Sequence, residues 1–243
     1  MCTVTYIPAK DAAFITSNRD EQQGRPPALP PEVYEGKTGR LLYPKDTAAG
    51  GTWFAVHENK SVLVLLNGAG QKHTPHPPYR KSRGLILLEL ADSEQILTDF
   101  KKLNLSNIEP FTLILLEEGS LYKCHWDGLN GTSRPLDASL PHIWSSVTLY
   151  DPPAIQKRKR WFEEWLLGYP NPDPENVMQF HHCSGDGDPH NDVLMNRDNQ
   201  VLTVSITSLQ LTAGLAHMSY HDIGGDKVFK KQLSLTHRIP AAS

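Results

Sequence analysis

The sequence has few cysteines and no long apolar run. Its 243 residues include 3 cysteines, an odd number that does not fit the disulfide framework of a small secreted domain. No apolar run approaches the ~20 residues that span a bilayer. The first residues, MCTVTYIPAKD, lack the basic segment and apolar stretch of a secretory signal. We therefore expect a soluble, cytoplasmic protein without stable membrane insertion.

The chain also has no excess of positively charged residues. The chain carries 24 Lys and Arg against 27 Asp and Glu, a net charge of -3, which argues against a protein that mainly neutralises phosphates. One basic cluster, Lys157-Arg158-Lys159-Arg160, could meet anionic lipid or nucleic acid. On a helix, however, these charges spread around much of the circumference, and a solvated face is the simpler interpretation. We expect no nucleic-acid partner.

Strand patterns lie at both ends of the chain, with helical patterns between them. Alternation of apolar and polar residues predicts an N-terminal hairpin from residues 2–7 and 12–16. Other predicted strands are 52–57, 61–66, 111–116, 121–126, 201–209, 215–222 and 227–235. Predicted helices are 82–91, 93–102, 155–167 and 174–182. With no internal repeat and no clear linker, the pattern predicts one α+β domain over residues 1–243 with mostly antiparallel sheet.

Cys2 is the first residue that could carry chemistry. Removal of Met1, which is usual before a small second residue, would give Cys2 a free α-amine. That amine has a reference pKa of ~7.7–8.0 and can accept the thiol proton near neutral pH. The alternative is a small buried structural cysteine.

The predicted hairpin gives the charged segment Asn18-Arg19-Asp20-Glu21 a position near the start of the chain. A turn at residues 8–11 would bring residues 17–20 beside the chain start, so Arg19 and Asp20 would lie next to Cys2. An arginine lowers the pKa of a thiol, and a carboxylate orients an ammonium group. A near copy, Asn196-Arg197-Asp198, has no terminal cysteine as its neighbour in sequence, and we interpret it as a distant hairpin tip.

These segments resemble a known family. MCTVTYIP, TSNRDEQQGRPP, AAGGTWFAV and VLVLLNG, followed by SRG at 82–84, are similar to the ordered motifs of the NRDE family, also called the transport-and-Golgi-organisation family. That family is similar to N-terminal-nucleophile hydrolases of the choloylglycine-hydrolase and acid-amidase type. The resemblance implies a four-layer αββα fold with Cys2 as the nucleophile.

The resemblance also implies roles for further residues. Arg19 and Asp20 would lie beside the nucleophile, and Asn67 would donate its side-chain amide to an oxyanion hole. Asn18, Trp53 and Ser146 are expected to bind substrate. Ser146 departs from the family pattern, because many relatives have asparagine there. This difference weakens the case for full hydrolase activity.

Two functions are compatible with these residues and with the resemblance. The first is a cysteine amidohydrolase that cleaves the C–N amide bond of a small acylated substrate. The second is a non-catalytic binding or transport protein of the same fold that handles haem or a lipid-like hydrophobic ligand, as the family's link to such ligands implies. We expect no cofactor and no metal, since the histidines and aspartates at 181–192 match no compact ligand spacing. The substrate and the oligomeric state stay open.

Overall fold

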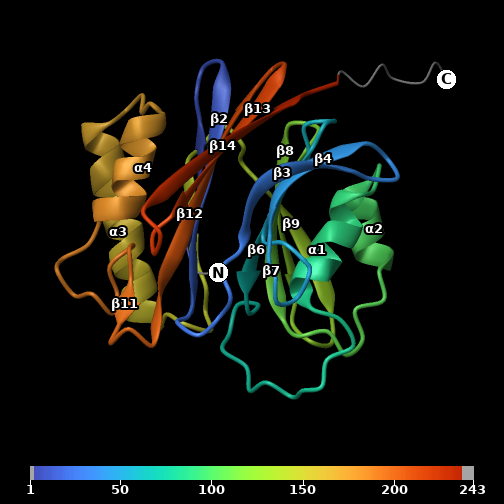
Figure 1. The fold of residues 1–243 in the computed structure, drawn as a ribbon, viewed down its shortest axis with the longest axis horizontal. Helices are drawn as coiled ribbons and strands as arrows, with labels where there is room; N and C mark the ends of the chain where they lie inside the picture. Colours follow the sequence, from blue (N-terminus) through green and yellow to red (C-terminus); the bar gives the residue numbers. More distant parts are fainter. Residues whose placement is uncertain (1–2, 237–243) are drawn as a thin grey trace.

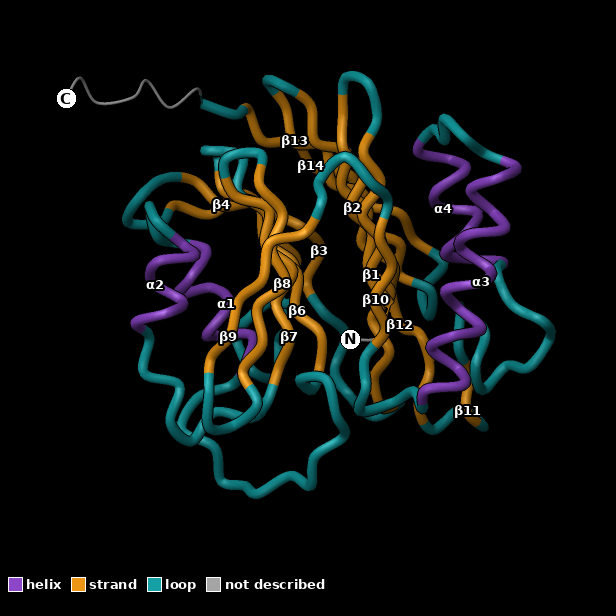
Figure 2. The backbone as a smooth tube through the Cα atoms, turned by 180° about the vertical axis from the view of Figure 1, so that it is seen from behind, coloured by secondary structure: helices purple, strands orange, loops and turns teal. Residues whose placement is uncertain are grey.

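Two antiparallel β-sheets lie face to face, and a pair of helices covers each outer side (Figure 1 and Figure 2). The computed structural model describes residues 3–236. Within these residues each sheet has seven strands. The layers therefore follow the order αββα, as the resemblance implied.

The first sheet contains both ends of the described chain. Its path of strands is β10 (His142–Ser145), β1 (Thr3–Pro8), β2 (Ala12–Gln22), β12 (Val201–Thr212), β13 (Leu215–Asp222) and β14 (Lys227–Ser234), while β11 (Asn196–Arg197) pairs with β12. The hairpin of β1 and β2 is thus at the centre of a sheet, and its two outer neighbours come from much later in the chain.

The second sheet is built from consecutive strands. Its order is β3 (Leu29–Glu35), β4 (Arg40–Lys45), β5 (Phe54–His57), β6 (Val62–Asn67), β7 (Phe111–Glu117), β8 (Ser120–Trp126) and β9 (Gly131–Leu136). A core of buried aliphatic and aromatic side chains fills the space between the sheets.

The helices cover the outer faces in sequence-local pairs. Helices α1 (Arg83–Ala91) and α2 (Ile96–Lys102) lie on the second sheet, and α3 (Pro152–Gly168) and α4 (Pro174–Cys183) lie on the first. Ser82, Asp151 and Asp173 begin three of them, each accepting a hydrogen bond from a first-turn backbone N–H, as N-cap residues do. No helix in the described residues is long and apolar enough to cross a membrane.

Apart from the two-residue β11, four strands were not predicted from the sequence: β3, β4, β9 and β10. Of these, β3, β9 and β10 are edge strands, where one side meets no partner and alternation of apolar and polar residues is weak. Prolines lie within β3, β4 and β9, and a proline normally argues against a strand unless it is at an edge or a bulge.

Strand β2 is longer than predicted, and this changes the interpretation of the charged segment. Its pairing with β12 continues to Gln22 opposite Val201, so residues 18–21 lie within a strand instead of a strand-to-loop junction. Side chains on a strand alternate between its two faces. Arg19 and Glu21 therefore face the second sheet, whereas Asn18 and Asp20 face helices α3 and α4.

Candidate functional site

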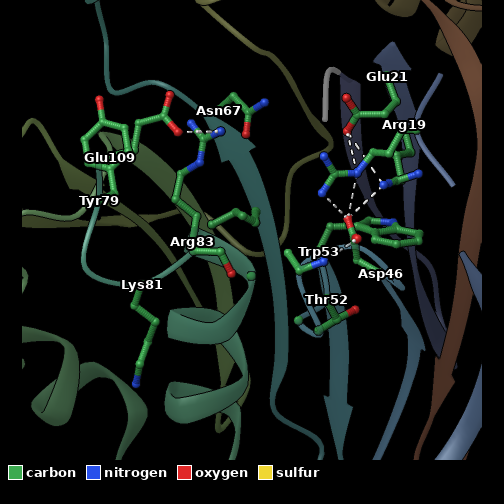
Figure 3. A pocket seen from close by; sticks show the side chains of 16 residues that line it. Arg19, Glu21, Asp46, Thr52, Trp53, Asn67, Tyr79, Lys81, Arg83 and Glu109 are labelled. Atoms are coloured by element: carbon green, nitrogen blue, oxygen red, sulfur yellow. Dashed lines mark hydrogen bonds and ion pairs between the residues drawn. The ribbon is translucent and has the colours of Figure 1, made fainter. Parts of the chain in front are cut away.

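A polar cavity of about 440 Å³ opens between the two sheets at the end of β2 and β6. We call it the charged cavity. Figure 3 shows charged side chains on two opposite walls, with Trp53 under Arg19 on one and Asn67 near Arg83 on the other. Its lining is Arg19, Glu21, Arg25, Asp46, Ala49, Gly51, Thr52, Trp53, Leu65, Asn67, Tyr79, Lys81, Ser82, Arg83, Gly84 and Glu109.

One wall is an ion-pair cluster around Asp46. Its Oδ2 accepts hydrogen bonds from Arg19 at 2.9 Å and from Arg25 at 2.7 Å. Burial alone would raise the pKa of the Asp46 carboxyl, but the hydrogen bonds from Arg25 and the Ala49 N–H, with the two arginine charges, hold that pKa below its usual range. Glu21 lies farther from both arginines, at 3.6 Å from Arg19 and 3.4 Å from Arg25. Of the two carboxylates on this wall, Glu21 therefore has the weaker contacts with the arginines.

Trp53 forms the floor under Arg19. The guanidinium carbon of Arg19 lies 4.6 Å from the centre of the indole ring, within the range of a cation–π contact. The indole is buried, and its N–H has no hydrogen-bond partner among residues 3–236. Trp53 therefore fixes the position of Arg19 and offers a donor at the cavity.

Asn67 ends β6 and lines the cavity. No hydrogen bond joins its side-chain amide to another described residue. Its backbone carbonyl accepts a hydrogen bond from the Ser146 hydroxyl at 2.9 Å, and that hydroxyl also contacts Thr148. Ser146 thus lies behind Asn67 and supports its backbone, and it does not line the cavity.

Asp20 points away from the charged cavity. Its buried carboxylate accepts hydrogen bonds from the Tyr150 hydroxyl at 2.7 Å and from the Thr203 hydroxyl at 2.6 Å. Tyr150 in turn lies under two guanidinium groups, those of Arg158 at 3.6 Å and Arg197 at 5.3 Å. Asp20 therefore connects β2 to the helical layer.

Asn18 also belongs to the helical side and does not reach the cavity. It is fully buried, its amide donates to the carbonyls of His181 and Val193, and its oxygen meets the Nδ1 of His181. The other ring nitrogen of that histidine meets Thr5 at 2.8 Å. Burial, with His182 and Arg158 nearby, lowers the pKa of His181 to about 3, so the ring is neutral.

The structure thus brings together three of the predicted site residues: Arg19, Trp53 and Asn67. It does not bring Asn18 and Asp20 to them, because a strand presents alternate residues to opposite faces. Cys2 lies outside the described residues. Sequence reasoning missed Glu21, although a period of two counted from Arg19 would have placed it on the same face.

The opposite wall was also missed, apart from the SRG motif. Arg83, the first residue of α1, forms an ion pair with Glu109 at 3.0 Å, and Glu109 lies 3.3 Å from His73. Lys81 lines the rim but pairs with Glu89 and points away in Figure 3. Arg83 begins a helix, whereas His73, Lys81 and Glu109 come from loops with no regular pattern.

The AAGGTW and SRG motifs meet at the bottom of this wall. A Cβ added to Gly51 would lie 2.4 Å from the backbone carbon of Gly84, and the Thr52 N–H donates to the Gly84 carbonyl at 3.3 Å. Only glycine allows this approach of helix α1 to the start of β5. Gly51 and Gly84 thus pack backbone against backbone at this point.

The second Asn-Arg-Asp copy forms a hairpin tip, as predicted. Asp198 and Asn199 adopt positive φ angles between β11 and β12. Arg197, however, returns to the Tyr150 ring and so contacts the group that binds Asp20. The second copy does not line the charged cavity. Through Tyr150 it contacts the residues that hold β2 in place.

Two other clusters have structural partners. In the basic cluster, Arg158 is fully buried, Lys159 pairs with Glu163, and Arg160 pairs with Glu164. In the loop at 185–192, Asp186 pairs with Lys157. Across residues 3–236, no group of three or more His, Cys, Asp or Glu side chains is arranged to hold a metal.

Solved structures similar to this one include a conjugated bile acid hydrolase and an acid amidase. The chain is similar to a mutant of the conjugated bile acid hydrolase from Clostridium perfringens, at TM-score 0.59 and 10% identity over 98% of this chain and 97% of that one. A second variant of that enzyme gives TM-score 0.58 and 11% identity over 100% of both chains. The Caenorhabditis elegans ortholog of N-acylethanolamine-hydrolyzing acid amidase gives TM-score 0.55 and 10% identity over 86% and 92%.

At such low identity these likenesses define the fold class, which is the four-layer N-terminal-nucleophile hydrolase sandwich. A search of curated protein sequences found no match. The sequence pattern of the Transport and Golgi organisation 2 family matches residues 1–207, and the chain belongs to this family.

Proposed function

We propose that this protein is a cysteine amidohydrolase that cleaves the C–N bond of a small acylated substrate, with Cys2 as nucleophile after loss of Met1. The observation that carries the proposal is the pairing of Thr3, the residue after Cys2. Thr3 pairs with Asn18 on one side and with Ser145 on the other. The next residues along those segments are Arg19 and Ser146, and Ser146 binds Asn67. Three separate chain segments thus converge at the start of β1.

In the proposed reaction the Cys2 thiol transfers its proton to its own α-amine and attacks the amide carbonyl carbon. The Asn67 amide stabilises the oxyanion of the tetrahedral intermediate. The C–N bond then breaks, the leaving amine takes the proton, and a thioester remains on Cys2. Water, deprotonated by the α-amine, attacks the thioester. The C–S bond breaks, the acid is released, and the thiol regains its proton.

The wall around Asp46 supplies the residues that activate the thiol and orient the α-amine. Arg19, fixed by Trp53 and Asp46, favours the thiolate over the thiol. Glu21 shares the face of Arg19 and has long ion pairs, so we assign it to orient the α-amine. Asp20 instead holds β2 against the helical layer through Tyr150 and Thr203.

The lining of the charged cavity favours a polar amide over haem or a lipid. Seven of its side chains are charged residues: Arg19, Glu21, Arg25, Asp46, Lys81, Arg83 and Glu109. A large apolar ligand would strip water from these groups and give no hydrogen bond in return. The carrier function therefore has less support from this site than hydrolysis.

The test combines intact mass with labelling by an electrophilic acyl-amide probe. We expect native protein without Met1, and an acyl group attached to Cys2. Cys2→Ala should abolish labelling and turnover. Cys124→Ala and Cys183→Ala are the matched controls and should keep both, since Cys124 is buried with its pKa raised to about 12 and neither lines the cavity. Retention of Met1, or labelling of Cys183 in preference to Cys2, would overturn the proposal.

A further inference from the structure

A second cavity adjoins the charged one and has a different character. It measures about 270 Å³ and shares three lining residues with the charged cavity: Arg19, Glu21 and Arg25. The rest of its lining is mainly apolar: Gln23, Pro26, Pro27, Ala28, Leu202, Val204, Tyr220, Asp222 and Gly224. We call it the apolar cavity. The two spaces are neighbours on either side of the same arginine and glutamate side chains.

A β-bulge opens the apolar cavity beside Arg19. On β12, Thr203 pairs with Asp20 and Ser205 pairs with Arg19, so Val204 is an extra residue opposite this step. Its carbonyl accepts the Ile223 N–H at 3.0 Å, and its side chain lines the cavity. Bulges re-aim side chains and are frequent next to active sites. Here the irregularity lies directly opposite the residue that we place beside the nucleophile.

We propose that the apolar cavity binds the acyl group of the substrate while the charged cavity binds its polar amine portion. The inference rests on the proposed function and adds a substrate class: amides that join a short apolar acyl group to a polar amine. An acyl group attached to Cys2 would lie beside Arg19, which borders both cavities. The hydrocarbon then leaves water for proline, leucine, valine and tyrosine surfaces, which is favourable for each methylene buried.

The size and rim of the apolar cavity limit the acyl length. Its volume equals that of ~9 water molecules at about 30 Å³ each, which suits a short chain such as hexanoyl. The lining also includes Gln23 and Asp222, whose polar groups would lose water without gaining partners if a longer chain covered them. The site is therefore unsuited to a long fatty acyl chain.

The test measures binding, so that it does not depend on turnover. Full-length protein with Cys2→Ala is titrated calorimetrically with N-acetylglycine, N-hexanoylglycine and N-dodecanoylglycine. We expect the hexanoyl compound to bind at least about tenfold more tightly than the acetyl compound, the effect of one well-bound methylene. The dodecanoyl compound should bind no more tightly than the hexanoyl one.

Substitutions in the apolar cavity then test whether the hexanoyl chain binds there. Val204→Phe fills the cavity and should remove the advantage of the hexanoyl over the acetyl compound. Val201→Phe is the matched control, because Val201 lies on the same strand outside the cavity, and it should keep the advantage. Ala28→Phe fills the cavity from the other side and serves if Val204→Phe lowers the melting temperature.

The outcomes separate this inference from the proposed function. Equal binding of acetyl and hexanoyl compounds, no detectable binding of N-hexanoylglycine, or an advantage that persists when the cavity is filled would each overturn the acyl subsite. A hexanoyl advantage in binding without any hydrolysis by the wild-type protein would leave the subsite standing and overturn the hydrolase.

Discussion

At the scale of single residues, two neighbouring carboxylates have opposite surroundings. Asp20 is buried and satisfied by two hydroxyl groups. Glu21 is partly exposed to the charged cavity, makes two long ion pairs, and accepts one hydrogen bond, from the Gln22 N–H at 3.1 Å. Asp20 thus has a structural role and Glu21 a proposed chemical one. Their roles differ because the two side chains lie on opposite faces of β2.

Isosteric amides distinguish these roles. Asp20→Asn should lower the free energy of unfolding by about 1–3 kcal/mol, because an amide nitrogen would replace an acceptor next to a hydroxyl donor. Glu21→Gln should change that free energy by less than about 1 kcal/mol yet reduce kcat/KM by about 10²-fold, the lower range for a group that serves acid–base catalysis. Urea unfolding and amide turnover measure the two effects. The reverse pattern would return the ammonium-orienting role to Asp20.

At the scale of elements, the position of helix α1 depends on glycine contact. Gly51 and Gly84 touch through their backbones, and both line the charged cavity. The start of β5, the N-terminus of α1 and the Arg83 wall are therefore fixed relative to one another at one point.

Gly51→Ala should be destabilising by about 1–3 kcal/mol, the usual effect of overpacking a close contact. Gly168→Ala is the control, because a Cβ at the end of α3 meets nothing within 4 Å, and it should be neutral or slightly stabilising. Thermal unfolding of the two variants gives the comparison. Equal melting temperatures would show that α1 can shift without loss.

The sequence predicted the elements whose pattern is local and buried. The β1–β2 hairpin carries an alternation signal, the strands around 54–57 and 62–67 are short apolar runs, and three helices begin at a Ser or Asp cap. Strands β3, β9 and β10 carry none, since edge position relaxes alternation and admits proline. Arg19, Trp53 and Asn67 were found through motifs. Arg83 and Glu109 were missed as a pair because only the fold brings the start of α1 and the loop before β7 together.

At the scale of the whole molecule, buried histidines make stability depend on pH. The pKa of His181 is lowered to about 3 in the folded protein by burial, against about 6.5 in an unfolded chain. Below about pH 6.5 the unfolded state takes up a proton that the folded state does not. The contribution of this neutral histidine is therefore present above pH 6.5 and is lost as pH falls.

Unfolding free energy should fall by about 1.4 kcal/mol for each pH unit between about 6.5 and 3 on account of His181. His125, with its pKa lowered to about 4 chiefly by burial, adds a similar term that is unaffected by changes at position 181. Urea unfolding at pH 7.5, 6.0 and 5.0 should thus show a shallower pH slope for His181→Gln than for the wild type. Identical slopes would contradict the assignment of a neutral buried ring.

The pairing of β2 with β12 also sets when the site can exist. Ala12 pairs with Thr212 and Asp20 with Thr203, so β2 leaves the ribosome long before β12, the strand it pairs with, has been made. At ~5–20 residues per second, the wait is roughly 10–40 s, and an isolated two-stranded hairpin is only marginally stable in water. That interval leaves time for the removal of Met1 that we propose. The charged cavity is complete only once β2 has paired with β12, so the nascent chain does not yet hold Arg19 and Glu21 in the geometry of the folded site.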